Sequence, residues 1–469
     1  MRLNNLFSLM ALVIIVLCGL GCSNRQPKVT RAGDVLEQTI AKTTKVPSDW
    51  KTLSKEAGPV DDNWVAAFGD KELLAMVDET LKNNLSLKTA AANVDLAAAQ
   101  AIIAGASLKP MFGISGGADR IDGTNTVRAK DIVGVVSWEM DLWDKLNSAA
   151  KAGKLAYAAT VEDFRAAQQS LAAQVSTTWF LVTQITQQRS LLDDSIKLLE
   201  EMKKIAQTRY EVGIVSESDA VLAAADIATT KEKRFNLQAT LELSERSLEV
   251  LLGRYPSAEI AVVDRFSSLP PAIPVDVPSA LLERRPDLVA AQQRIAATSE
   301  SVEEARGARL PSFSLTAGGG HSSKDLKSLL GVDNKFYKVG INFVAPISTG
   351  GALEAQIDIS KSRYNAALTA YGQQALLAFK EVEQYLSQEQ ILGEREELLK
   401  VASQQNERAL DLGRKQYDVG QIDMMSILQM QGRLLKANST LVAIRYDRLA
   451  NRVALHLALG GSFVASETR

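Results

Sequence analysis

Few side chains in this 469-residue sequence have the types and spacing that catalysis or metal binding requires. The two histidines, His321 and His456, lie at neither metal-ligand nor catalytic-triad spacing from a suitable partner. The segment GGGHSS around His321 lacks the strand–loop–helix context of a phosphate-binding loop. Acidic pairs such as Glu396–Glu397 occur among Arg and Lys, which favours solvated helix faces. The sequence therefore predicts no enzyme, no metal site and no cofactor.

A covalent modification is the chemistry that the sequence indicates best. The apolar run over residues 6–20 is too short for a comfortable membrane span and is typical of a signal-peptide core. It ends in GLGC, so we expect a signal peptide over residues 1–21 and a lipid on Cys22. Gly19 stands where lipoprotein signals usually have Leu, and plain secretion with cleavage nearby is the alternative. Ser23, in place of the retention residue Asp, favours the outer membrane.

Composition limits the remaining classes of function. The net charge of -2 and the pI of about 6.0 provide no basic field for nucleic acid. Cys18 is removed with the signal peptide, so no disulfide framework is expected. Aromatic residues are only 6% of a chain that is 46% hydrophobic, and Ala is abundant. This mixture indicates long helices rather than a bulky globular core.

The sequence contains an internal duplication. RYEVGIVSESD begins at Arg209, and the similar QYDVGQID begins at Gln416. An offset of 207 residues relates Tyr210 to Tyr417 and also Gly213 to Gly420, far more than the period of a solenoid repeat. We expect repeat 1 at residues 63–253, a connector at 254–278, repeat 2 at 279–461, an N-terminal tail at 22–62 and a C-terminal tail at 462–469.

Each repeat is predicted to contain the same elements in the same order. A helix comes first, over residues 73–104 in one repeat and 279–308 in the other. Two strands follow, at about 111–120 and 131–142 in repeat 1 and about 312–320 and 336–347 in repeat 2. A long helical hairpin completes each repeat, and it reverses at Gly213 or at Gly420 because glycine permits a tight turn.

The strands alternate in polarity with a period of two. Val136, Trp138 and Met140 share one face, opposite Ser137 and Glu139. Alternation over about ten residues is typical of a membrane-spanning barrel strand, although a soluble sheet with one wet face gives the same pattern. Four strands cannot close a barrel, and an open edge in lipid leaves unpaired amides at several kcal/mol each. If the strands cross a membrane, several chains must combine them.

The helical segments show a spacing of seven residues. This spacing indicates a coiled-coil seam, and a helix over residues 143–212 would be about 105 Å long at 1.5 Å per residue. A soluble bundle or coiled-coil spacer is the alternative. The positions are Leu191, Leu198, Ile205 and Val212 in repeat 1 and Ile391, Leu398 and Leu412 in repeat 2.

These features together resemble the TolC-like outer membrane factor family. The resemblance covers residues 64–461 and is carried by SWEMDLWDKLNSAAKAG, ERRPDLVAAQQRIAAT, RLPSFSLTAGG, APISTGGALEAQI and the paired turn phrases. It is closest to the lipidated branch that serves multidrug efflux of the resistance–nodulation–division type. The resemblance implies a mainly α-helical homotrimer. Each chain would supply four strands to a twelve-stranded outer membrane β-barrel, which a twelve-helix periplasmic barrel continues.

The resemblance also implies partners and sites. The hairpin turns would contact a periplasmic adaptor, which links the duct to an inner-membrane pump. The adaptor-contacting residues implied are Val212, Gly213, Val419 and Gly420. For the glycines, simple turn chemistry is an explanation that holds alongside this one.

A gate is implied near the turns, where threefold symmetry would multiply any pore-facing charge by three. Gln429 in SILQMQ stands where related chains often have Asp, so Asp423 is the acidic candidate instead. N-terminal capping of the returning helices is the alternative role for Asp423 and Asp219. The remaining gate candidates are the acidic Glu217, beside Asp219, and the apolar Met424, Met425, Ile427 and Leu428.

The expected function is passive conduction of small molecules, such as drugs or toxic compounds, from the periplasm to the exterior. An outlet for type I protein secretion and a periplasmic coiled-coil scaffold without a pore are the alternatives. No motif identifies the transported substrate.

Overall fold

A computed structural model of the chain describes residues 47, 50–51, 63–121, 127–261, 265–273 and 278–461. The predicted signal peptide, Cys22, most of the N-terminal tail and the tail at 462–469 lie outside these residues. The chain divides into two compact units. We call the described residues of Ala97–Tyr157 and Gln292–Thr369 the sheet unit. The hairpin unit consists of the described residues of Ile40–Leu96, Ala158–Ala291 and Ala370–Arg469.

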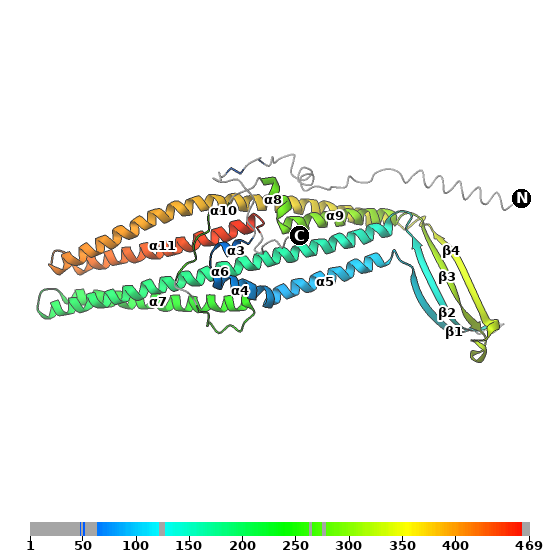
Figure 1. The fold of residues 1–469 in the computed structure, drawn as a ribbon, viewed down its shortest axis with the longest axis horizontal. Coiled ribbons are helices and arrows are strands. Elements are labelled where there is room, and N and C mark those ends of the chain that lie inside the picture. The colour runs from blue at the N-terminus through cyan, green and yellow to red at the C-terminus, as the bar shows by residue number, and fades with distance from the viewer. Residues whose placement is uncertain are drawn as a thin grey trace. The chain divides into compact units, whose positions relative to one another are not determined.

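The two halves of the chain repeat one order of elements (Figure 1). The first half contains α3 (Trp64–Ala67), α4 (Lys71–Asn83), α5 (Leu85–Ala106), β1 (Met111–Ile121), β2 (Val127–Met140), α6 (Lys145–Glu211) and α7 (Glu217–Leu252). The second half contains α8 (Pro278–Arg284), α9 (Pro286–Gly307), β3 (Ser312–Ser323), the short 3-10 turns η1 (Leu326–Ser328) and η2 (Val332–Asn334), β4 (Lys335–Val344), α10 (Ala352–Asp418) and α11 (Met424–Ala458).

Helix lengths repeat between the halves. Both α6 and α10 contain 67 residues, which corresponds to about 100 Å at 1.5 Å per residue. Their returning partners α7 and α11 contain 36 and 35 residues. The fold class predicted from the sequence, mainly helical with a strand portion and an internal duplication, is confirmed.

The first helix of each repeat is interrupted, contrary to the sequence prediction. The helix expected over residues 73–104 breaks at Asn84, whose backbone is extended. The Asn84 side chain accepts a hydrogen bond from the Leu87 N–H at 3.0 Å and so caps the start of α5. The helix expected over 279–308 breaks between α8 and α9, because Pro286 lacks an N–H and disfavours helical geometry in the preceding residue.

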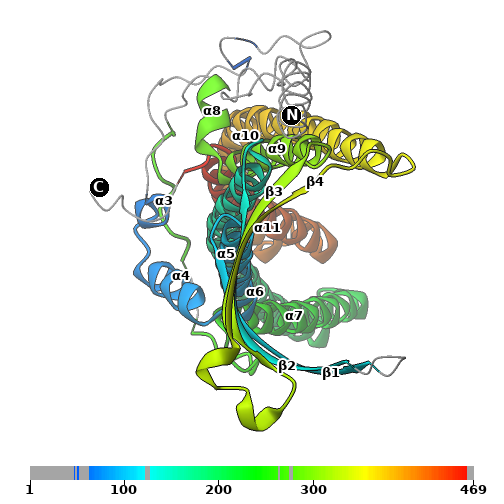
Figure 2. The same cartoon turned by 90° about the vertical axis from the view of Figure 1, so that its right-hand side faces the viewer.

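The four strands form one curved antiparallel sheet in the order β1-β2-β3-β4 (Figure 2). Strand β4 ends at Val344 rather than near 347, since Pro346 cannot donate to a ladder. The register places most of the large apolar side chains on one face. On the apolar face one row is Phe112, Val136, Ala317 and Val339, and the next is Trp138, Leu315 and Ile341. The opposite face has rows such as Ser137–Thr316–Gly340 and Glu139–Ser314–Asn342.

Close contacts fix the ends of the helices in the sheet unit. The Trp143 indole N–H donates to the Pro311 carbonyl at 2.7 Å, and Asp141 accepts from the first N–H groups of α6. A Cβ added at Gly153 would lie 3.0 Å from the Ala104 Cβ. The small residues Gly153 and Ala104 therefore let α6 and α5 approach closely.

In the hairpin unit, the Asp70 carboxylate accepts hydrogen bonds from several elements of the chain. It caps α4 by accepting from the Glu72 and Leu73 N–H groups, both at 3.0 Å. The same carboxylate accepts from the Trp179 indole at 2.9 Å and from the Ser267 hydroxyl at 2.7 Å. Burial raises the pKa of Asp70, but these hydrogen bonds outweigh it and hold the pKa below its usual range. One carboxylate thus joins α4, α6 and the connector.

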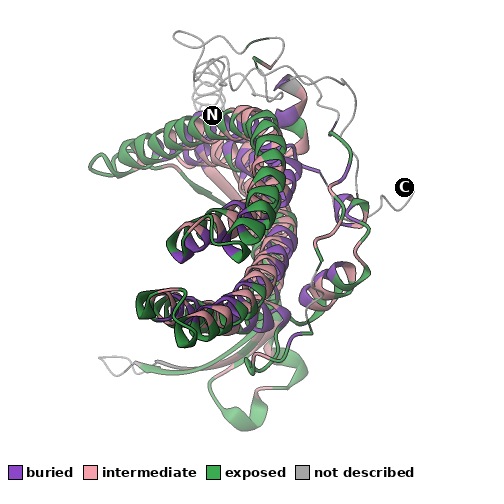
Figure 3. Ribbon diagram, turned by 90° about the vertical axis from the view of Figure 1, so that its left-hand side faces the viewer, coloured by how far each residue is buried: buried purple, intermediate pink, exposed green. Residues whose placement is uncertain are grey.

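The predicted coiled-coil seam coincides only in part with the surface that the chain buries. On α6 the predicted Leu198 and Ile205 are partly buried and pack against a cluster whose buried members include Leu199 and Ala206, one residue further along. On α10, the predicted seam residue Leu398 is 72% exposed, whereas Leu410 and Tyr417 are buried. Figure 3 shows buried and exposed residues as separate stripes along the hairpin helices. The seven-residue spacing thus forms a second apolar stripe on α10, which we call the outer stripe: Ile391, Leu398 and Leu412.

Candidate functional site

The two hairpin turns have the same backbone geometry. Gly213 and Gly420 both have φ near 75°. The Gly213 N–H donates to the Tyr210 carbonyl and the Ile214 N–H to the Arg209 carbonyl, both at 2.9 Å. The second turn repeats this pair of bonds 207 residues later, at 3.0 and 2.9 Å. Both turns are Schellman motifs, which need a left-handed residue where each helix ends.

Backbone conformation, rather than crowding, requires glycine at these turns. A Cβ added at Gly213 or Gly420 would have no neighbouring heavy atom within 4 Å. A left-handed backbone costs other residues about 1–2 kcal/mol. The turn chemistry predicted for the two glycines is therefore present.

The helices that leave the turns are capped by different residues. Asp423 is the N-cap of α11, and its carboxylate accepts from the Ser426 N–H at 2.8 Å. This hydrogen bonding lowers the pKa of Asp423. Helix α7 is capped by Ser216, so the capping role expected of Asp219 is wrong. Asp219 lies in the first turn of α7, where a carboxylate still favours the helix dipole.

Arg209 joins the two turns. Its guanidinium donates to the Tyr417 carbonyl at 2.7 Å and to the Asp418 carbonyl at 2.8 Å, at the end of α10. It also lies 4.6 Å from the centroid of the Tyr417 ring. The charge of Arg209 therefore complements both the ring face and the negative end of the α10 dipole.

An open cleft of about 660 Å³ lies between the turns. Asp219 and Asp423 line it from the two hairpins, and Arg209 and Tyr417 line it from the two long helices. Burial, and then the charge of Asp423, raise the pKa of Asp219. Burial, and then the charge of Asp219, raise the pKa of Tyr417, whose hydroxyl has no hydrogen-bond partner among the described residues. The cleft is thus acidic apart from Arg209.

The apolar gate candidates lie mostly inside the chain. Met424 and Ile427 are 0% and 1% exposed, and they pack with Tyr417 against α6 and α7. Leu428 belongs to the same cluster, whereas Met425 is exposed. Met424 and Ile427 therefore stabilise the packing of the two hairpins, and a contribution to the wall of a passage would require that packing to open.

The polar gate candidates and the turn tips are accessible. Glu217, Asp423 and Gln429 are exposed, and Asp219 is half-buried. Val212 and Val419, one in each turn, are both exposed despite being apolar. No described residue of the chain covers these two valines.

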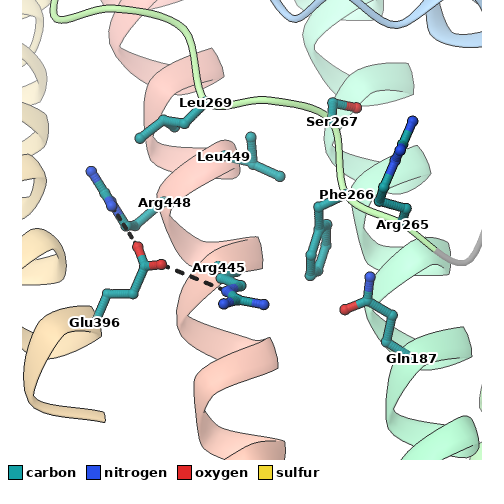
Figure 4. Close-up of a pocket in the computed structure, with 9 residues that line it drawn as sticks. All are labelled: Gln187, Arg265, Phe266, Ser267, Leu269, Glu396, Arg445, Arg448 and Leu449. Carbon is teal, nitrogen blue, oxygen red and sulfur yellow. Dashed lines mark hydrogen bonds and ion pairs between the residues drawn. The ribbon is translucent and has the colours of Figure 1, made fainter. Parts of the chain in front are cut away.

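A second cavity, of about 300 Å³, lies where the connector crosses α6 and α11 (Figure 4). Arg448 donates to Glu396 at 2.5 Å, and Arg445 approaches the same carboxylate at 3.6 Å. Nearby, Arg452 donates to the Pro270 carbonyl at 2.5 Å and to Glu389 at 2.7 Å. The contact with Pro270 attaches the connector to α11, and the contacts with Glu396 and Glu389 join α11 to α10, so the residues around this cavity stabilise the packing of the hairpin unit.

The histidines show no catalytic arrangement. His456 is buried and stacks on Trp64 with ring centroids 5.7 Å apart. Burial, and then the charge of Arg452, lower the pKa of His456 to about 3, so the ring is neutral at physiological pH. His321 lies on the sheet, opposite Ile132 and Lys335. The described residues contain no group of three or more His, Cys, Asp or Glu that could hold a metal ion.

The sequence reasoning missed the roles of Arg209 and Tyr417. A signal was present, because the duplicated phrases differ there: Arg209 of repeat 1 corresponds to Gln416 of repeat 2. The paired tyrosines also differ, since Tyr210 is 41% exposed and Tyr417 is 2% exposed. A difference between duplicated copies thus indicates where they contact each other.

Comparison with known families gives a match over most of the chain. The family described as "Outer membrane efflux protein" matches residues 76–254 and 277–461, one segment in each repeat. Among curated relatives, the "Pyoverdine export outer membrane protein OpmQ" of Pseudomonas aeruginosa is 28% identical over 435 residues, covering 89% of this chain and 91% of that protein. The "Toluene efflux pump outer membrane protein TtgC" of Pseudomonas putida is 27% identical over 434 residues, covering 89% and 88%.

Solved structures give the same result for the fold. The Campylobacter jejuni CmeC outer membrane channel superposes with a TM-score of 0.84 at 24% identity, covering 91% of this chain and 95% of that one.

Proposed function

This chain belongs to the outer membrane efflux protein family, and we propose that three copies of it form one duct through the outer membrane. The family places the chain in an exit path for small molecules from the periplasm. We further propose that the duct binds a periplasmic adaptor and an inner-membrane pump, and that residues near the hairpin turns form its gate.

The observation that carries the proposal is the open four-stranded sheet. Among the residues that the structure describes, strands β1 and β4 each pair on one side only, so each has a row of unpaired backbone groups. In lipid such an edge costs several kcal/mol per unsatisfied group. Two chains would supply eight strands, and side chains nearly fill the interior of an eight-stranded barrel. Three chains would supply twelve, the smallest closed set of this unit that leaves a passage.

The faces of the sheet support a position in the membrane. The apolar face is well exposed, and Val339 reaches 81% exposure. A soluble sheet would cover such residues with its own helices. The opposite face has rows of Ser, Thr, Asn and Gly beside Val133, Val135 and Phe336, and its polar rows suit the wall of an aqueous duct.

The helices support contact with further copies. The outer stripe on α10 has a seven-residue spacing, as in a coiled coil, interrupted by the polar Gln405, and its three residues are exposed among the described part of the chain. On α5, a helix long and apolar enough to cross a membrane by length and composition alone, Leu96, Ile102 and Ile103 are also exposed. Neighbouring copies would bury both surfaces.

Lipid attachment at Cys22 is the second part of the proposal. The signal-peptide core, the GLGC ending and Ser23 support an acyl anchor in the outer membrane. The anchor would hold the N-terminal end of each chain at the membrane.

The partners follow from the turns. Val212, Gly213, Val419 and Gly420 form two exposed apolar tips with identical backbone geometry. Two similar tips per chain give six in a trimer, a repeating surface on which the hairpins of a periplasmic adaptor can dock. The inner-membrane pump would be of the resistance–nodulation–division type, in line with the sequence resemblance.

The gate would lie at the cleft between the turns. In a trimer, the three copies of Asp423, Asp219 and Glu217 would form an acidic ring, with Gln429 as a neutral neighbour. Arg209 holds the second hairpin against the first, so opening requires its bonds to break. Met424 and Ile427 would then be uncovered during opening.

The relatives of this chain export compounds of different chemical classes. The relatives named above serve pyoverdine and toluene export, which differ greatly in size and polarity. The described residues line no pocket specific to either compound, and we propose that the pump makes the selection.

Planar bilayer recording tests the function. Purified full-length protein, added in detergent to a planar bilayer, is expected to give discrete conductance steps with a preference for cations. Absence of any conductance from a correctly folded preparation would overturn the duct.

A further inference from the structure

The two faces of the sheet differ in the sign of their charges near the strand turns. Alternation places Lys130, His321 and Lys335 on the apolar face, in the same rows as Ile132 and Ser323. No Asp or Glu of the described strand residues lies on this face.

The acidic residues occupy the other face. Asp119, Asp131 and Glu139 all alternate onto the polar face. Lys338 is the one basic residue among the described strand residues of that face. Because a one-residue change of register would reverse every side chain, this separation of charge is fixed by the sheet pairing.

The basic residues follow directly after an apolar band. Along β2 the band runs from Met140 to Ile132, about 27 Å at 3.4 Å per residue, which a strand tilt of about 40° reduces to about 21 Å of height. That height approximates the apolar band of an outer membrane barrel. Lys130 comes two residues later, and Lys335 is paired with His321 in the row of Ile132, at the end of the band. The basic residues thus lie where a lipid layer changes from acyl chains to headgroups.

Neither lysine is neutralised by the chain. Lys130 and Lys335 make no ion pair or hydrogen bond within the described residues. Arg120 lies on the same face nearer the β1–β2 turn and is exposed. The turn between β3 and β4 adds Lys324 and Lys327 but also Asp325 and Asp333, so it does not cancel the charge on the strands.

We propose that Lys130, His321 and Lys335, which we call the basic rim, bind the phosphates of a glycolipid in the outer leaflet. The sugar headgroup of this lipid carries phosphate, and its acyl chains lie on the apolar band. The proposal rests on the proposed function, because the duct orients the strand turns toward the exterior. Lys130 and Lys335 would contact phosphate, while Tyr337 and Ile132 border the acyl chains. Charge complementarity and the adjacent apolar band favour a lipid over a free anion.

The test is lipid binding to purified full-length protein in neutral detergent, followed by native mass spectrometry. The probes are bisphosphorylated lipid A and the same lipid A after phosphate removal. We expect the phosphorylated form to bind at least about tenfold more tightly, since each lysine near a charged lipid surface contributes about a fivefold effect. The preference is expected to fall as salt rises. Equal binding of the two lipids would overturn the proposal.

Matched variants identify the site. The double variant Lys130→Gln/Lys335→Gln is expected to lose most of the preference for phosphate. Lys338→Gln, on the opposite face of β4, is expected to retain it, as is Lys335→Arg. If the double variant fails to assemble, Lys335→Gln alone replaces it. An unchanged preference for phosphate in the Lys130→Gln/Lys335→Gln or Lys335→Gln variant would contradict the lipid site. An equal loss of that preference in Lys338→Gln would contradict it too. Displacement of lipid by millimolar inorganic phosphate would identify a free-anion site instead and also refute it.

The proposed function is checked separately in the same samples. Chain number and bilayer conductance of the unmodified protein test the duct. Normal conductance with no phosphate preference would refute the lipid site alone, and absence of conductance would refute the duct.

Discussion

Removal of the Arg209 side chain is predicted to loosen the contact between the two hairpin turns. Arg209→Ala deletes two hydrogen bonds from a charged donor to carbonyls and one cation–π contact. A hydrogen bond to a charged group contributes about 1.5–3 kcal/mol when buried, but the Arg209 side chain is 19% exposed, so we take the lower end. The ring contact adds about 0.5–1 kcal/mol.

The loss is therefore about 3.5–4 kcal/mol for each chain, which at its lower end changes an opening equilibrium by a factor of about 300. If the bonds of Arg209 hold the passage closed, the variant spends more time open. Single-channel recording in planar bilayers measures this as a higher open probability. The open probability of Arg209→Lys is expected to lie between those of the unmodified protein and Arg209→Ala, because an ammonium lacks the planar fork that reaches both carbonyls.

Arg414→Ala is the matched control. Arg414 lies on the same helix as Tyr417, but its exposed ion pair with Glu201 spans 3.7 Å and contributes at most about 1 kcal/mol. Native mass measurement of each variant checks that assembly is intact. An open probability for Arg209→Ala equal to that of Arg414→Ala would refute the role assigned to Arg209.

Three further predictions concern charge, backbone and pH. Asp423→Asn is expected to weaken cation preference in single-channel recordings while the melting temperature stays unchanged, since Asn caps a helix as well as Asp does; unchanged ion selectivity would remove Asp423 from the gate. Gly420→Ala is expected to cost about 1 kcal/mol through its positive φ, whereas Gly393→Ala, inside α10 and in open space, is expected to be neutral or stabilising; equal melting temperatures would contradict this. Asp70→Asn is expected to cost about 1–2 kcal/mol at neutral pH. Because the folded pKa of Asp70 lies below its usual value of 3.8, that contribution is present above this value and is lost as pH falls through the folded pKa, so the difference in melting temperature should shrink below about pH 4.

The strands and the duplication were predictable from the sequence because both depend on near neighbours. Alternation around Trp138 fixes which side chains share a face, whatever the rest of the chain does. The turns at Gly213 and Gly420 were also identified, since a left-handed residue after a long helix needs glycine. Local rules gave the elements and their order.

The packing of the helices was not predictable in the same way. The seven-residue spacing of Leu398 marks an apolar stripe but does not say whether the partner helix belongs to the same chain. The chain buries a neighbouring stripe instead, with Leu410 and Tyr417. A helix that contacts partners on two sides has two seams, and the sequence pattern does not assign them.

The contact of Arg209 with Tyr417 depends on distant parts of the chain. The two residues are 208 positions apart, and the copies of this motif resemble each other in sequence. Only the packing of one hairpin against the other makes Tyr417 buried and leaves Tyr210 exposed. The break at Asn84 has a similar cause, because its amide also donates to the Leu251 carbonyl at 2.9 Å from another helix.

The number of chains in the detergent-extracted particle tests the central claim most directly. One chain has a four-stranded sheet with two unpaired edges and an exposed apolar face. Native mass measurement is predicted to give three chains per particle, stable only with detergent or lipid present. A single chain that stays folded and soluble without detergent would contradict the shared barrel and the duct that depends on it.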